Sequence, residues 1–292
     1  MIEKNLLTIT ILEGIEESEG CPLCYLWVKS EKLHMEHLLT NEVVMNPEFR
    51  EKVQSAKGFC NYHMHLLYNT ARQGHTEDGF GYALYMQDIV ERISKDLESL
   101  PSYMGSLEGS ANSNVFARGR RRRNAYQLLS NKAENAVQGQ QPCPACESLW
   151  SSDQIHLHTL VQMLDNDKFR EEFKSSKGLC LPHFIMAVRM SGRLKLKNQA
   201  QVTRALIEVE IKRLQLVEHY LSEFVRKQSW DFSDEPWGPE ANANSIVLNL
   251  LVGAEGLYGK NNRALSRCKE AIDYEEIERR AEDESKVKLK RI

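Results

Sequence analysis

The sequence has little of what marks a secreted or membrane protein. Its N-terminal residues show no basic start, long apolar stretch and small-residue cleavage site, so no signal peptide is expected. The most apolar late stretch, Ile246 to Ala254, is far shorter than the roughly 20 residues that a membrane-spanning helix requires. The net charge is only −3, so no overall field attracts nucleic acid or anionic lipid. We expect a soluble, cytoplasmic protein that binds no membrane.

Signatures of the common enzyme classes are also missing. The sequence has no Gly-rich phosphate loop, nucleophile elbow, kinase motif set or His-Glu-x-x-His zinc-protease motif. Strand-like alternation of apolar and polar residues is equally hard to find, although a hydrophobic content of 41% is enough for a sizeable core. These absences argue against a common enzyme and favour a mainly α fold.

What the sequence does contain is an internal repeat. Residues 5–63 align with residues 127–183, at an offset of 122 residues that changes to 120 near the end. The fifteen residues from Phe49 to His63 match those from Phe169 to His183 at eight positions. Such agreement indicates a duplicated helical module.

Cysteine and histidine recur at matched places in both copies. Each copy reads Cys-Pro-x-Cys, a spacer, and then Gly-[Phe/Leu]-Cys-x-x-His. A reducing compartment keeps thiols open, and two such half-sites supply the three sulfurs and one nitrogen of a tetrahedral zinc site. We expect two zinc ions per chain, each closed within its own copy. The candidate ligands are Cys21, Cys24, Cys60 and His63 in the first copy, and Cys143, Cys146, Cys180 and His183 in the second.

Other interpretations of these residues stay open. The half-sites could exchange partners between copies or approach each other to form a binuclear centre. Three thiolates and one imidazole can also hold an iron-sulfur cluster, although the closely spaced cysteines of ferredoxins are absent. The Cys-Pro-x-Cys pairs could instead be redox dithiols, a use that the missing βαβ pattern disfavours. Buried structural cysteines are the remaining alternative.

Apolar periodicity predicts the organisation along the chain. Helices are expected from Tyr25 to Leu39 and from Glu147 to Leu164, and each copy continues into a long amphipathic helix, around Phe80 to Leu97 and Val202 to Phe224. The expected parts are a first metal-binding repeat (1–100), a basic flexible linker (101–124), a second metal-binding repeat (125–229), a turn and helix packed on the repeats (230–258) and a charged tail (259–292) whose apolar residues are too sparse for a buried face.

A few further residues are weaker candidates. His34 and His156 occupy matched places and could be spare ligands, support a ligand or lie on a helix surface. Glu51 or Glu171 could orient a ligand histidine, although a solvated helix face is the simpler interpretation. The linker carries a run of arginines that could contact a nucleic-acid backbone, although such runs are more often solvated. These are Arg118, Arg120, Arg121, Arg122 and Arg123.

With the doubled motifs in view, together with the late segment from Phe232 to Gly253, the chain resembles the prokaryotic family named domain of unknown function 6062. The likeness covers about residues 5–258. It implies a cytoplasmic protein bearing doubled Cys and His motifs, with no established activity, and it carries over the eight candidate ligands. The arginine-rich linker and the extension after Tyr258 depart from the family pattern. We expect a non-enzymatic helical zinc protein that presents a surface to a protein partner; the alternative is an iron-sulfur or dithiol redox protein.

Overall fold

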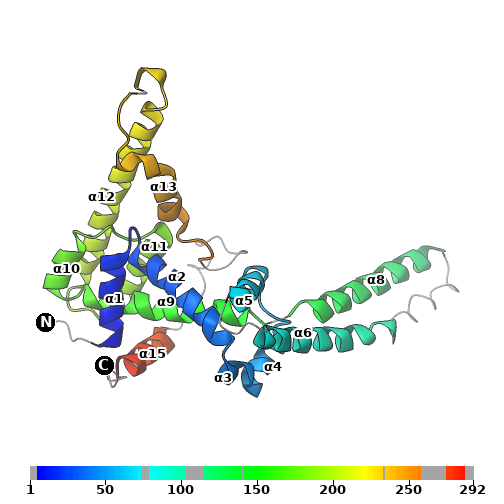
Figure 1. Cartoon of the computed structure of the whole chain (residues 1–292). Helices are drawn as coiled ribbons and strands as arrows, with labels where there is room; N and C mark the ends of the chain where they lie inside the picture. Colours follow the sequence, from blue (N-terminus) through cyan, green and yellow to red (C-terminus); the bar gives the residue numbers. More distant parts are fainter. Residues whose placement is uncertain are drawn as a thin grey trace. The chain divides into compact units, whose positions relative to one another are not determined.

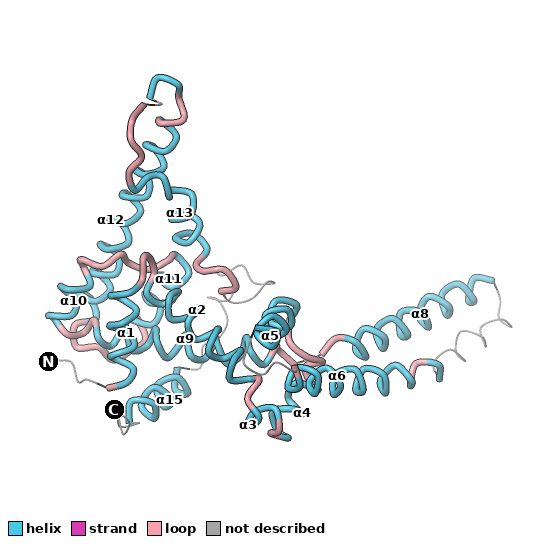
Figure 2. The backbone as a smooth tube through the Cα atoms, in the orientation of Figure 1, coloured by secondary structure: helices cyan, strands magenta, loops and turns pink. Residues whose placement is uncertain are grey.

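The computed structural model describes residues 5–73, 79–102, 115–139, 141–232, 234–257 and 274–286. Within these ranges the chain forms helices and no strands, which confirms the predicted mainly α class (Figure 2). Among the same residues, no helix combines the length and apolar composition needed to cross a bilayer.

The chain divides into two compact units that are not consecutive in sequence. Unit 1 comprises residues 1–31 and 149–292, and unit 2 comprises residues 32–148. The division falls within α2 (Pro22–Leu38) and within α9 (Pro144–Met163), so both helices contribute to both units (Figure 1). It therefore differs from the two successive repeats, 1–100 and 125–229, expected from the sequence.

Unit 1 is built on the C-terminal part of α9 and on the long helix α12 (Gln199–Arg226). Val202, Leu206 and Val209 follow one another at helical spacing on α12 and are all buried. They join the core beside α11 (Leu181–Ser191). The other elements of unit 1 are α1 (Leu6–Glu17), α10 (Asp167–Phe173), η2 (Trp230–Phe232), η3 (Pro239–Asn242), α13 (Ala243–Val252) and α15 (Tyr274–Lys286).

Unit 2 has its own core around Tyr85, whose side chain is fully buried on α6 (Phe80–Glu98). The Tyr85 hydroxyl donates a hydrogen bond of 2.8 Å to the carbonyl oxygen of Leu38, and the ring meets those of Phe49 and Phe59 edge to face. The cluster ties the end of α2 to α6. The other helices of unit 2 are α3 (Asn41–Val44), α4 (Pro47–Ser55), α5 (Asn61–Gln73) and α8 (Val115–Val137).

The short helices α4 and α10 begin in the same way. Asn46 caps α4 and Asn166 caps α10, each accepting a hydrogen bond from the backbone N–H three residues on, at Phe49 and Phe169. Such caps satisfy an N–H group that the first turn leaves unpaired. The two caps thus fix where each short helix starts.

Two segments differ from their sequence interpretation. The arginines 118–123, expected in a flexible linker, belong to α8, which packs against α6. The charged tail, expected to lack a buried face, contains α15, where Ile277 and Ala281 are buried and Ala281 packs with Leu7 and Ile155. Because the side chain of Ala281 is small, α15 can approach α1 closely. A few apolar residues are therefore enough to give α15 a narrow buried face.

Candidate metal centres

The eight predicted ligands gather into two groups of four. Centre 1 consists of Cys21, Cys24, Cys180 and His183, and centre 2 consists of Cys60, His63, Cys143 and Cys146. Within each group, one potential ligand atom per residue lies within 4.8 Å of all the others. Each centre takes its Cys-Pro-x-Cys pair from one sequence copy and its Cys-x-x-His pair from the other. The expected closure within each copy is therefore wrong, and the exchanged arrangement is the one that the structure adopts.

Helix length explains the exchange. α2 begins directly after Cys21, and its 17 residues carry the chain about 25 Å before α3 starts. At that far end, Met35 and Leu38 pack in one cluster with Phe59 and Leu67, the residues that flank the Cys60 half-site. Likewise α9, with 20 residues, carries the chain about 30 Å from Cys143 before α10 leads to Cys180. Along the chain, a long helix therefore stands between the two half-sites of each copy.

Every half-site lies at a helix N-terminus. Pro22 and Pro144 are the first residues of α2 and α9, where a missing N–H costs nothing. Cys180 is the residue before α11, and Cys60 is the residue before α5. Helix N-termini present unpaired N–H groups and a partial positive charge, which favours the thiolate form that binds metal.

A glycine turn brings each Cys-x-x-His pair into its helix. Gly58 and Gly178 have φ angles of 103° and 72°, in the left-handed region that side chains disfavour. A Cβ atom at Gly58 would lie 2.7 Å from the Cε atom of Met64, and one at Gly178 would lie 3.1 Å from Cγ1 of Val209. The backbone conformation therefore favours glycine at both positions, and a Cβ atom would also press on Met64 and Val209.

Centre 1 has the geometry of a four-ligand site. The Nδ1 atom of His183 lies 3.4, 3.5 and 3.1 Å from the sulfurs of Cys21, Cys24 and Cys180, and the sulfurs of Cys24 and Cys180 are 3.5 Å apart. Around a tetrahedral zinc ion, neighbouring sulfur and nitrogen ligands lie about 3.5–3.8 Å from one another. The four side chains are all buried. Their spacing suits one ion with no open position.

Asp153 orients the histidine of centre 1. Its Oδ1 atom accepts a hydrogen bond of 3.0 Å from Nε2 of His183, and both side chains are almost fully buried. Because Asp153 holds Nε2, Nδ1 is the ring nitrogen that faces the three sulfurs. Carboxylates that hold a ligand histidine in this way are a recurrent feature of metal sites.

The sequence interpretation missed Asp153 and named Glu171 instead, whose side chain is exposed and paired with Lys174. Glu51 is exposed as well. A signal was present: at the 122-residue offset, Asp153 aligns with Glu31, and both carboxylates are buried. A buried acid at matched places is a better indicator than an acid near the motif.

The segment after α13 closes over centre 1. Gly253 has a φ angle of 82°, and a Cβ atom there would lie 3.5 Å from the sulfurs of both Cys24 and Cys180. Leu257 is buried in the same core. A hollow of about 250 Å³ remains beside Cys21 and Cys24, with Asn249 and Ala254 in its wall. The positive φ angle favours glycine here, and a Cβ atom would also press on the side chain of Leu257.

Centre 2 repeats the geometry with less cover. The Nδ1 atom of His63 lies 3.3, 3.6 and 3.2 Å from the sulfurs of Cys60, Cys143 and Cys146, and the sulfurs of Cys60 and Cys146 are 3.7 Å apart. His63 and Cys146 are buried, whereas Cys60 and Cys143 are half-buried. Centre 2 is therefore the more accessible of the two.

The electrostatics of both centres favour a cation in the middle. Burial opposes ionisation of Cys21, but contacts with Cys180, Cys24 and His183 outweigh it and hold the pKa of Cys21 well below its usual value. Burial also opposes protonation of His183, yet Asp153 and the thiols raise its pKa well above the usual value. In centre 2, contacts with Cys143 and Cys146 lower the pKa of Cys60, while Cys143, Cys60 and burial raise that of Cys146. Ionisation of one thiol in a centre therefore opposes ionisation of its neighbours, and a divalent ion would balance the negative charge.

His34 and His156 lie close to the centres without joining them. Both are half-buried and neither belongs to a group of candidate ligands. Burial lowers the pKa of both, to about 4 for His34, and the nearby ligand histidines His63 and His183 add to the effect. These two residues therefore remain neutral near physiological pH.

We expect Asp153→Asn to lower the affinity of centre 1 for its metal ion by about 10- to 100-fold, because His183 loses the charge that orients it. The affinity of centre 2 should stay unchanged. Competition with a chromophoric chelator measures both affinities. Glu171→Gln, an exposed change on α10, is the matched control and should leave both unchanged. Equal affinities in Asp153→Asn and the unaltered protein would contradict the role of Asp153.

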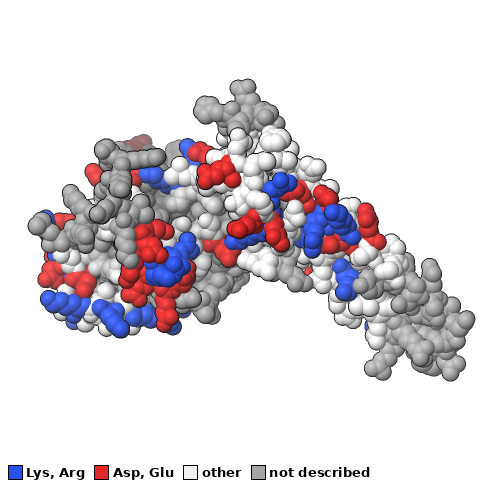
Figure 3. Space-filling model, turned by 90° about the horizontal axis from the view of Figure 1, so that it is seen from below, with Lys and Arg blue, Asp and Glu red and all other residues white. Residues whose placement is uncertain are grey.

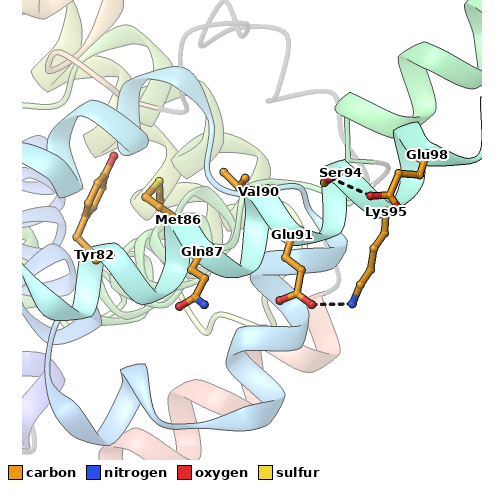
Figure 4. A pocket seen from close by; sticks show the side chains of 9 residues that line it. Tyr82, Met86, Gln87, Val90, Glu91, Ser94, Lys95 and Glu98 are labelled. Atoms are coloured by element: carbon orange, nitrogen blue, oxygen red, sulfur yellow. Dashed lines mark hydrogen bonds and ion pairs between the residues drawn. The ribbon is translucent and has the colours of Figure 1, made fainter.

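Among the described residues, no further group of candidate metal ligands lies outside the two centres. On the face in Figure 3, Lys and Arg side chains alternate with Asp and Glu. The side chains of Arg118 to Arg122 lie outside the described part, and Arg123 is exposed. A hollow of about 910 Å³ runs along α6, and its described lining residues all belong to that one helix; among them Lys95 pairs with Glu91 and Ser94 with Glu98 (Figure 4).

Fold and sites together define an all-helical protein with two candidate Cys3His metal centres. The chain belongs to the family of unknown function DUF6062, whose family model matches residues 2–254. The match covers the eight candidate ligands, Asp153 and Gly253, and ends before α15. No curated protein and no solved structure matches the chain.

Proposed function

We propose that this protein is a non-enzymatic helical scaffold stabilised by two structural zinc ions. The observation that carries the proposal is the exchange of half-sites. Centre 1 joins α2 to α11, and centre 2 joins α5 to α9, so each ion ties together helices that are 80 or more positions apart in the sequence. Cross-links between distant helices stabilise a fold far more than links within one helical turn.

The full ligand set supports a structural rather than a catalytic role. Catalytic zinc keeps a position for water or substrate, whereas three sulfurs and one nitrogen complete a tetrahedral site. The buried Nδ1 and sulfur atoms of centre 1 surround the place that an ion would take. We therefore propose no hydrolysis at either centre, and we propose that the helices so fixed present a surface to a protein partner.

The ligand spacing also favours a single ion over an iron-sulfur cluster. In a [4Fe–4S] cluster each ligand binds a different iron, and in a [2Fe–2S] cluster the four ligands are divided between two irons, so both spread the ligand atoms more widely than one ion does. Here the ligand atoms of each centre lie within 4.8 Å of one another. A single small ion fits such a spacing best, and zinc is the usual partner of a Cys3His set.

Elemental analysis and an absorption spectrum test the proposal on protein purified without oxygen or added metal. We expect about two zinc ions per chain and no visible band. Cobalt substitution should then produce the thiolate and d–d bands of a tetrahedral sulfur-rich site. Iron with acid-labile sulfide would replace the proposal with a redox protein, and protein without metal would favour the dithiol hypothesis.

A further inference from the structure

Unit 1 contains a second feature that neither metal centre uses. A pocket of about 460 Å³ lies between α12, the loop after α10 and the segment that begins α13. Its volume falls in the range of small-molecule sites. Aliphatic side chains form one part of its lining and cationic side chains another.

One part of the lining is aliphatic. Val209, Leu216 and Val217 come from α12, and Ile246 comes from α13. Val209 and Val217 are 4% exposed, whereas Leu216 is 48% exposed at the opening. Tyr220 is the one aromatic side chain in the lining. Such a wall suits a flexible hydrocarbon chain better than a stacked ring system.

The other part of the lining is positively charged. The described lining residues include four cations, Lys174, Lys177, Lys212 and Arg213, and one acid, Glu19. The Nζ atom of Lys177 donates to the carbonyl oxygen of Ser18 at 3.0 Å, and Nη1 of Arg213 donates to that of Leu179 at 3.2 Å. Neutral carbonyls hold these two side chains in place without balancing their charge.

Nearby acids balance only part of the charge. Glu171 lies 2.7 Å from the Nζ atom of Lys174. Burial raises the pKa of Glu210, beside Arg213, to about 7, so this carboxyl is only partly ionised at neutral pH. Ser176 accepts a hydrogen bond from the N–H of Gly178, which leaves its hydroxyl proton able to donate to an anion. The pocket therefore combines an apolar wall with excess positive charge.

We propose that this pocket binds a small molecule with an anionic head, carboxylate or phosphate, and a single apolar chain. The chain lies along Val209, Leu216 and Ile246, and the head meets Lys177, Lys212 and Arg213. Binding of this small molecule is separate from the proposed structural role of the metal ions. The loop that carries Lys177 continues directly into Cys180, so the pocket and centre 1 share a backbone segment.

Isothermal titration of the full metal-containing protein tests the site. The probes are dodecanoate, dodecyl phosphate and neutral dodecanol, all below the concentrations at which they form micelles. We expect one dodecanoate or dodecyl phosphate per chain, bound at least about tenfold more tightly than dodecanol. The tighter of the two anions identifies the head group. Equal affinity for dodecanol, or binding of neither anion, would overturn the proposal.

Surface variants locate the site without disturbing the core. Lys212→Glu and Leu216→Asp should each weaken anion binding by about tenfold or more. Lys195→Glu, in the loop before α12, and Leu214→Asp, an exposed leucine on α12 outside the pocket, are matched controls that should bind normally. Equal weakening in the controls would place binding elsewhere. Metal content measured on the same samples separates failure of this proposal from failure of the metal proposal.

Discussion

The double variant Cys24→Ser/Cys60→Ser should hold no metal, whereas Cys24→Ser/Cys180→Ser should keep one of the two ions. Cys24 and Cys60 belong to one sequence copy but to different centres, and Cys24 and Cys180 belong to different copies but to centre 1. Losing a thiolate ligand removes most of the affinity of a four-ligand site. The two doubles therefore distinguish exchanged from unexchanged half-sites.

Elemental analysis of the dialysed proteins provides the measurement. Cys60→Ser/Cys146→Ser is the counterpart within centre 2 and should also keep one ion, and the single variants should each keep one. Closure within each copy would give the reverse result, with one ion left in Cys24→Ser/Cys60→Ser and none in Cys24→Ser/Cys180→Ser. That pattern would refute the arrangement described here.

Withdrawal of the metal should unfold much of the helical structure. A structural zinc site supplies on the order of 10 kcal/mol of folding free energy, which is comparable to the whole stability of a typical domain. A chelator used with a reductant at neutral pH should lower the far-ultraviolet circular dichroism in two steps. Centre 2 should release its ion first, because Cys60 and Cys143 are half-buried while Cys180 and His183 are fully covered. Full helicity and an unchanged melting temperature in metal-free protein would rule out a structural role.

The positions of the tryptophans allow the two units to be followed separately. The four tryptophans of the chain, at 27, 150, 230 and 237, all belong to unit 1. Cys180→Ser should therefore change the tryptophan fluorescence as unit 1 melts, while Cys60→Ser should lower helicity with little change in that fluorescence. A tryptophan response to both variants would show that the units unfold together.

Much of this protein can be predicted from local patterns. Apolar residues at helical spacing predict α6 and α12, because this pattern depends on contacts only a few residues apart. The candidate ligands could be predicted for the same reason: Cys-Pro-x-Cys and Cys-x-x-His each form within one turn. Their duplication makes both pairs conspicuous without any knowledge of the fold.

Contacts between distant residues decided the rest. Gly253 is one of 16 glycines in the sequence, and only the fold shows its positive φ angle and its place against Leu257 and the sulfurs of Cys24 and Cys180. Asp153 resembles many other acids until His183 approaches from 30 positions away. Ala281 becomes a buried residue only because Leu7 and Ile155 meet it.

The sequence by itself determined the helical class, the eight candidate ligands and their division into half-sites, because each depends on short-range geometry. Only the tertiary structure decided which half-sites meet. α2 and α9 are continuous helices of 17 and 20 residues. Each stands along the chain between the Cys-Pro-x-Cys pair and the Cys-x-x-His pair of its own copy. Each Cys-Pro-x-Cys pair therefore completes its centre with the Cys-x-x-His pair of the other copy.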